Sequence, residues 1–137
     1  MAYTHSITVP HAWDDAVART REALADQGFG VLTEIDVRAT FTQKLGQDAG
    51  DQIGDYIILG ACNPQLAQRG MTAEPQLGAL LPCNVVVRRA PDASETTVET
   101  IDPQTMVQLA GTPAIRQVAD DADSRLTAVL KALSQQR

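Results

Sequence analysis

Residues 56–64 read Tyr-Ile-Ile-Leu-Gly-Ala-Cys-Asn-Pro, and this stretch holds the change of local structure on which the fold depends. Its first six residues are a continuous nonpolar run, which is typical of an interior strand that is covered on both faces. Asn63 then supplies an N-cap, and Pro64 has the φ angle that a first helical residue needs. The stretch predicts a buried strand that runs directly into a short helix, with Cys62 at the junction.

The segments on either side alternate between strand and helix patterns. Period-two alternation predicts strands at residues 4–9 and 29–36, and β-branched residues predict two more at 85–88 and 95–101, joined by a turn. Apolar residues at helical spacing predict a first helix that begins near Ala12 and a long helix near the end of the chain. Three glycines and three aspartates predict an exposed loop at residues 46–55. The final helix has one apolar stripe, formed by Ile115, Val118, Ala119, Ala122, Leu126, Val129, Leu130 and Leu133.

This order of elements predicts a single α+β domain over residues 1–137. We expect a mainly antiparallel sheet of four to five strands, with the long first and last helices on one face and short extra helices between strands. Such a sheet has a second face to cover. If that face is apolar, pairing with a second copy covers it, so we expect a homodimer.

Composition and charge exclude several classes of partner. The 137 residues are 44% hydrophobic and 20% charged, with a formal net charge of −6. A net negative charge repels phosphate backbones and anionic lipids, so we expect neither nucleic acid nor membrane as a partner. No stretch approaches the roughly 20 apolar residues of a membrane span, and we expect a cytoplasmic protein.

The two cysteines are the strongest candidates for chemistry. Cys62 precedes a predicted helix start, where free backbone N–H groups favour a thiolate. Cys83 shares a strand face with Val85 and Val87, and if the two strands are neighbours both thiols open onto one pocket. Since free cysteine often only fills space in a core, packed thiols remain the alternative.

Both cysteines are followed by asparagine. The residues that we expect to bind a ligand are Cys62, Asn63, Cys83 and Asn84, and the two thiols are the catalytic candidates. Asn63 is expected to cap a helix, whereas Asn84 either satisfies backbone groups or presents its amide to a ligand.

The remaining polar residues carry no recognised catalytic or cofactor signature. Glycine-rich phosphate loops, the G-x-S-x-G elbow and H-E-x-x-H are all absent from the sequence. We expect no metal and no cofactor, because Cys-x-x-Cys spacing is missing and the only histidines, His5 and His11, flank the first strand. Asp120, Asp121 and Asp123 are predicted to form a hydrated helix face.

Residues 58–64, 80–87 and 101–103, with 28–37 upstream, resemble the domain of unknown function 302 family. The similarity extends from about residue 11 to 133, and its motif positions here are Cys62, Asn63, Pro64, Pro82, Cys83 and Asn84. The resemblance implies a small α+β domain with a TATA-binding-protein-like arrangement of one strand, a helix, four strands and a helix. It implies no reaction.

Three functions remain open on the sequence. The first is binding of a small ligand, or sensing, at a pocket near Cys62 and Cys83. The second is a structural or interaction module that acts as a homodimer, and the third is a thiol-dependent redox protein or enzyme. We rank ligand binding first, because no third catalytic group accompanies the two thiols.

Overall fold

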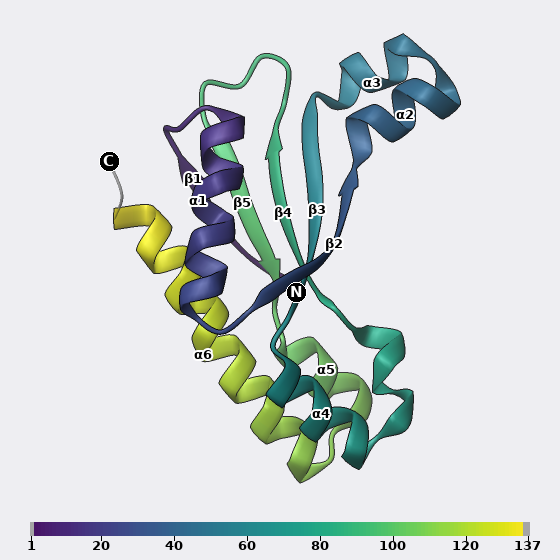
Figure 1. Ribbon diagram of the computed structural model, residues 1–137, viewed down its shortest axis with the longest axis vertical. Helices are drawn as coiled ribbons and strands as arrows, with labels where there is room; N and C mark the ends of the chain where they lie inside the picture. Colours follow the sequence, from purple (N-terminus) through teal and green to yellow (C-terminus); the bar gives the residue numbers. More distant parts are fainter. Residues whose placement is uncertain (1, 136–137) are drawn as a thin grey trace.

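The computed structural model describes residues 2–135, and these residues form one five-stranded antiparallel sheet in the order β1-β5-β4-β3-β2 (Figure 1). The strands are β1 Thr4–Val9, β2 Gly30–Asp36, β3 Asp55–Cys62, β4 Cys83–Arg89 and β5 Thr96–Ile101. The helices are α1 Trp13–Asp26, α2 Val37–Leu45, α3 Gln47–Ile53, α4 Pro64–Ala73, the 3-10 helix η1 Pro75–Leu80, α5 Gln104–Ala110 and α6 Pro113–Gln135. The predicted α+β class and antiparallel sheet are confirmed.

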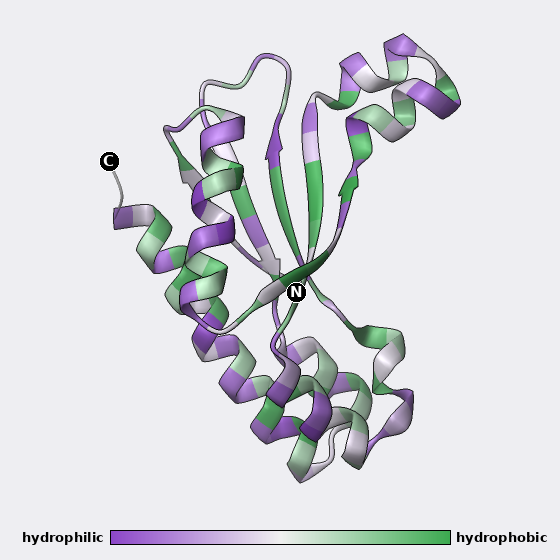
Figure 2. Ribbon diagram, in the orientation of Figure 1, coloured by the Kyte–Doolittle hydropathy of each residue, from purple (hydrophilic) through white to green (hydrophobic). Residues whose placement is uncertain are grey.

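The two long helices, α1 and α6, pack against each other and against the same side of the sheet (Figure 1). Side chains alternate across each strand, so every second residue of β3, β4 and β5 points toward these helices. Hydrophobic and hydrophilic residues alternate along α6 as its surface turns toward the sheet and away from it (Figure 2). The centre of this core is formed by Leu24, Leu59, Val85, Val87, Val98, Leu126 and Val129, all fully buried.

The nonpolar run at residues 56–61 is an interior strand as predicted, but the expectation that both faces are covered is wrong. Ile57, Leu59 and Ala61 are buried beneath the helices, whereas Tyr56 and Ile58 on the opposite face are only half-buried. The long helices among the described residues, α1 and α6, both lie on one side. Apolar content alone does not report whether a second layer exists.

Residues 46–55 are not a loop, because Gln47–Ile53 forms helix α3. The three glycines that suggested a loop have other roles. Gly46 and Gly54 flank the helix with φ angles of 103° and 77°, which residues with side chains rarely adopt. Gly50 lies inside α3, where a Cβ would collide with Thr42 of α2. Glycine here ends one helix and allows close packing of two.

No helix within residues 2–135 combines the length and the apolar character that crossing a membrane requires.

Candidate ligand-binding site

A cavity of about 240 Å³ lies where β3 ends and β4 begins, beside α4 and α6. Its wall is mostly apolar, and its polar atoms come from a few side chains at the strand ends. The apolar wall includes Phe29, Leu66, Met71, Leu81, Met106, Val118 and Ala122. Thr33, Cys62, Asn63 and Cys83 also line it. None of the lining residues is Asp, Glu, His, Lys or Arg, so this lining holds no charged side chain.

Asn63 connects the strand to the helix that forms one side of the cavity. Its Oδ1 accepts a hydrogen bond of 3.1 Å from the backbone N–H of Leu66, which is the N-cap role that the sequence predicted. The residue is 6% exposed, and Pro64 follows it at the first helical position. The chain therefore turns from β3 into α4 within one residue, and this turn places Cys62 and Leu66 on the same cavity.

Strand pairing places the two cysteine residues near each other at the cavity. Ala61 lies opposite Cys83 in the antiparallel pair of β3 and β4, and Cys62 directly follows Ala61 in the sequence. Cys83 is 7% exposed, and Cys62 is half-buried. Both are free thiols.

The environment of Cys83 disfavours its ionised form. Burial, and to a smaller extent the neighbouring Cys62, raises the pKa of the Cys83 thiol to about 11. A thiol with this pKa is protonated at neutral pH and is a poor nucleophile. Cys83 therefore contributes an apolar, polarisable wall to the cavity instead of a reactive group.

Asn84 is the one expected ligand-binding residue that does not line this cavity. It is exposed and lies opposite Gly60 in the register of β3 and β4, on the sheet face that no long helix of residues 2–135 covers. Because successive side chains point to opposite faces of a sheet, Asn84 faces away from the side to which Cys83 points. The structure thus groups Cys62, Asn63 and Cys83 and leaves Asn84 outside.

Gly60 allows the strands near the cavity to approach closely. A Cβ at this position would collide with Oγ1 of Thr33 and would lie 2.9 Å from Cγ of Pro82. Any side chain at residue 60 would therefore push β2 or Pro82 away from β3. The glycine in the nonpolar run is a sequence signal for such an approach, but it does not name the partners.

Sequence reasoning missed most of the cavity wall. Met106, Val118 and Ala122 come from α5 and α6, far along the chain from the two cysteines. The apolar stripe of the last helix contained Val118 and Ala122 as core residues. A hydrophobic stripe has the same pattern whether it faces packed side chains or an open space, so the stripe could not reveal a cavity.

The sheet, the helices and the cavity together define a small α+β protein with a mostly apolar cavity at one end of its sheet. The sequence profile of Domain of unknown function DUF302 matches residues 5–133, and the chain belongs to this family. The chain is also similar to the crystal structure of the uncharacterized conserved protein DUF302 from Bacillus stearothermophilus. That similarity has a TM-score of 0.85 and 28% sequence identity and covers 97% of this chain and 99% of that one. Among curated proteins, none shows significant similarity to the chain.

Proposed function

We propose that the protein binds a small, uncharged and largely apolar ligand in the cavity beside Cys62 and Cys83. The observation that carries this proposal is a lining with apolar side chains, two thiols, one hydroxyl and one amide, but no charged group. Binding sites for small molecules typically combine an apolar wall with a few polar groups that fix orientation. Bringing a charged ligand into this space would leave its charge unpaired and is unfavourable.

The size of the cavity limits the ligand. An apolar cavity of about 150 Å³ holds one benzene molecule, and this cavity measures about 240 Å³. It therefore suits a substituted aromatic ring or a short acyl chain. The side chains of Thr33, Cys62 and Asn63 are the polar groups that a hydroxyl or carbonyl on such a ligand would meet, because the bond from Leu66 to Asn63 Oδ1 leaves the amide N–H groups of Asn63 available.

Filling the cavity tests this proposal. Ala67 lines the cavity from α4, and Ala67→Leu places three more carbon atoms there. Ala73→Leu is the matched control, because Ala73 is exposed at the end of the same helix. We expect titration with benzyl alcohol, followed by calorimetry, to show binding that Ala67→Leu weakens by about tenfold or more and Ala73→Leu leaves unchanged. Equal binding by both variants, or binding of benzoate as strongly as benzyl alcohol, would reject the proposal.

The free thiols also support a cytoplasmic location as part of this proposal, because a reducing compartment keeps such cysteines unpaired. A thiol-dependent redox function depends on Cys62 alone, given the raised pKa of Cys83.

We propose as a second function that the uncovered sheet face pairs with a second copy of the chain. Ile35 is 51% exposed there, opposite Ile58 in the register of β2 and β3, and Val86 lies opposite Ile58 on the other side. The face also carries Arg88 and Glu99, joined by a 2.7 Å hydrogen bond. This pair is neutral although the chain has a net charge of −6, so two copies meeting at this face do not oppose like charges.

Light scattering tests the dimer. We expect a dimer mass at micromolar concentration for the wild type and a monomer mass for Ile35→Asp, which places a charge in the proposed interface. Gln43→Asp, at an exposed position of helix α2 and not on the sheet, should leave the dimer intact. A monomeric wild type would rule out this second function.

A further inference from the structure

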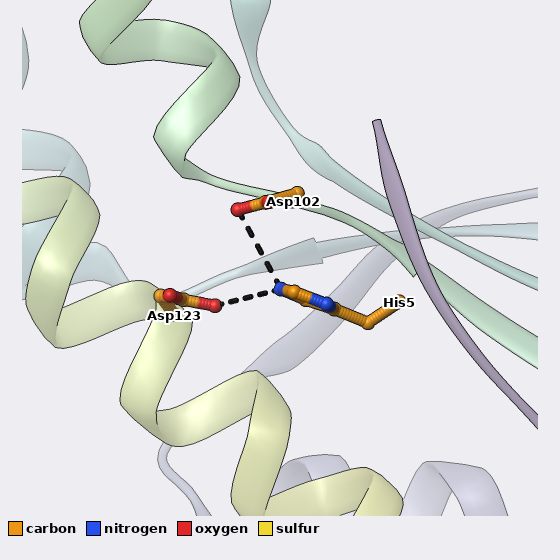
Figure 3. Close-up of side chains that lie close together, drawn as sticks. All are labelled: His5, Asp102 and Asp123. Atoms are coloured by element: carbon orange, nitrogen blue, oxygen red, sulfur yellow. Dashed lines mark hydrogen bonds and ion pairs between the residues drawn. The ribbon is translucent and has the colours of Figure 1, made fainter. Parts of the chain in front are cut away.

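His5, Asp102 and Asp123 converge on one point at the surface (Figure 3). They come from β1, from the turn between β5 and α5, and from α6. The Nε2 atom of His5 lies 2.9 Å from Oδ1 of Asp123 and 3.5 Å from Oδ1 of Asp102. The interpretation of Asp123 as part of a merely hydrated helix face is therefore wrong.

One ring nitrogen faces two carboxylate oxygens in this cluster. A neutral imidazole carries a single N–H, so Nε2 has at most one proton to donate to the two oxygens. The three side chains are between 23% and 37% exposed, which screens their charges less than full exposure does. A cation at the centre of the cluster would satisfy both carboxylates and the nitrogen together.

Three carboxylates of comparable burial elsewhere in the described chain each have a permanent cation beside them. Asp55 pairs with Arg38, Glu99 with Arg88, and Asp121 with Arg125. By contrast, the ion pairs of Asp102 and Asp123 among residues 2–135 are both with His5. Within the described part of the chain, the negative charges of these two carboxylates are therefore not balanced by an ion pair with Arg or Lys.

The spacing of the three atoms suits a tetrahedral zinc ion. Zinc bonds of about 2.0 to 2.2 Å in tetrahedral geometry separate neighbouring ligand atoms by roughly 3.3 to 3.6 Å. The 3.5 Å separation between His5 Nε2 and Asp102 Oδ1 lies at this range, whereas the 2.9 Å separation between His5 Nε2 and Asp123 Oδ1 is a hydrogen-bond distance that would lengthen by about 0.4 Å on binding. All three candidate ligand atoms lie within 4.8 Å of one another, so small side-chain movements are sufficient.

Asp102 is also held in place by its own neighbours. Its Oδ1 accepts a 2.9 Å hydrogen bond from the backbone N–H of Gln104, and its backbone N–H donates to the carbonyl of Tyr3 at 2.8 Å. Hydrogen bonds to a ligating carboxylate commonly orient it toward a metal. The second bond ties the turn after β5 to the start of β1, where His5 lies.

We propose that Nε2 of His5 and one carboxylate oxygen each of Asp102 and Asp123 bind a Zn²⁺ ion, with a water molecule as the fourth ligand. One imidazole and two carboxylates suit zinc better than magnesium, which prefers oxygen ligands in octahedral geometry. The ion would clip β1 to α6, joining residues that are 118 positions apart in the sequence. This site is separate from the apolar cavity and does not depend on the proposed ligand.

Zinc titration of the full chain tests the site, with Zn²⁺ alone as the probe after treatment with a chelator. We expect one Zn²⁺ per chain for the wild type, and a loss of affinity of about 100-fold or more in Asp123→Asn and in His5→Gln, because even changes outside the ligand shell cost about 10- to 100-fold. Asp26→Asn, which removes an exposed carboxylate at the end of α1, should bind zinc like the wild type. Far-ultraviolet circular dichroism of the metal-free variants verifies that they are folded.

Cys62 and Cys83 could also bind zinc, so a second experiment distinguishes binding by the cysteines from binding by the His5 cluster. The variant Cys62→Ser should bind Zn²⁺ as tightly as the wild type, and cobalt bound to the wild type should lack a thiolate charge-transfer band. Binding that survives Asp123→Asn but disappears in Cys62→Ser would overturn the proposal, as would a wild type that binds no zinc at micromolar concentration.

Discussion

The apolar cavity and the His5 cluster lie on different sides of α6 at the same height, because Ala122 lines the cavity and Asp123 reaches His5. Consecutive helical residues point about 100° apart, so one step along α6 moves from an uncharged space to three polar side chains. In the cavity, burial raises the pKa of Cys83 and excludes charge. In the cluster, partial exposure permits two carboxylates to face one imidazole. The comparison shows that residues next to each other on one helix can face surroundings of very different polarity, because one side is buried and the other is partly exposed.

The largest loss of stability should come from truncating a buried side chain of α6, the helix on which both the cavity and the His5 cluster depend. Leu126 is fully buried on α6, about one turn after Ala122 and Asp123. Leu126→Ala leaves a cavity in the core and should lower the free energy of unfolding by about 2 to 5 kcal/mol. Urea denaturation measures this loss. Thr127→Ala, at an exposed position beside it, should change stability by less than about 0.5 kcal/mol, and similar effects of the two substitutions would show that α6 is not packed as described.

The buried position of Cys83 should make the stability of the protein depend on pH. The pKa of Cys83 is raised to about 11 in the folded chain, and an unfolded thiol titrates near 8.5. The unfolded state therefore loses its proton first, and the stabilisation is present below pH of about 8.5 and lost as the pH rises toward 11. The free energy of unfolding of the wild type should therefore fall by on the order of 3 kcal/mol more than that of Cys83→Ala over this pH range. Thermal unfolding of both proteins from pH of about 7 to about 11 measures it, and parallel curves would contradict the assigned environment.

The smallest expected effect separates the two asparagines that follow the cysteines. Asn63→Ala removes the N-cap of α4 and should destabilise the protein by about 1 kcal/mol. It should also loosen the cavity wall and weaken ligand binding. Asn84→Ala changes an exposed side chain and should alter stability by less than about 0.5 kcal/mol. Unfolding in guanidinium chloride measures the stability of both variants. An equal loss of stability in the two would contradict the role of Asn63 as the stabilising N-cap of α4.

The part of the site that the sequence predicted without any condition depends on a local pattern. The cap at Asn63 follows from two adjacent residues. The shared cavity of Cys62 and Cys83 was predicted only on the condition that their strands are neighbours, which the pairing of β3 and β4 fulfils. His5 and Asp123 are 118 positions apart and share no pattern. Their contact depends on how α6 crosses β1, which periodicity does not specify.

The errors in the fold have similar origins. Glycine at residues 46, 50 and 54 was ambiguous, because the same residue breaks a helix and permits close helix packing. The run at residues 56–61 predicted a strand but not how many of its faces a helix covers. The local sequence indicates whether a segment is a strand. Whether a helix covers each face of that strand depends on elements that are far away in the sequence.

Methyl NMR of methionine can detect a neutral apolar ligand inside the cavity. Met71 and Met106 both line the cavity, and Met106 is 5% exposed. Titration of protein labelled at the methionine methyl groups with benzyl alcohol should shift both signals in a saturable way, and benzoate should shift neither. A Met106 signal that does not respond to benzyl alcohol, or that responds equally to benzoate, would contradict the binding of a neutral apolar ligand in this cavity.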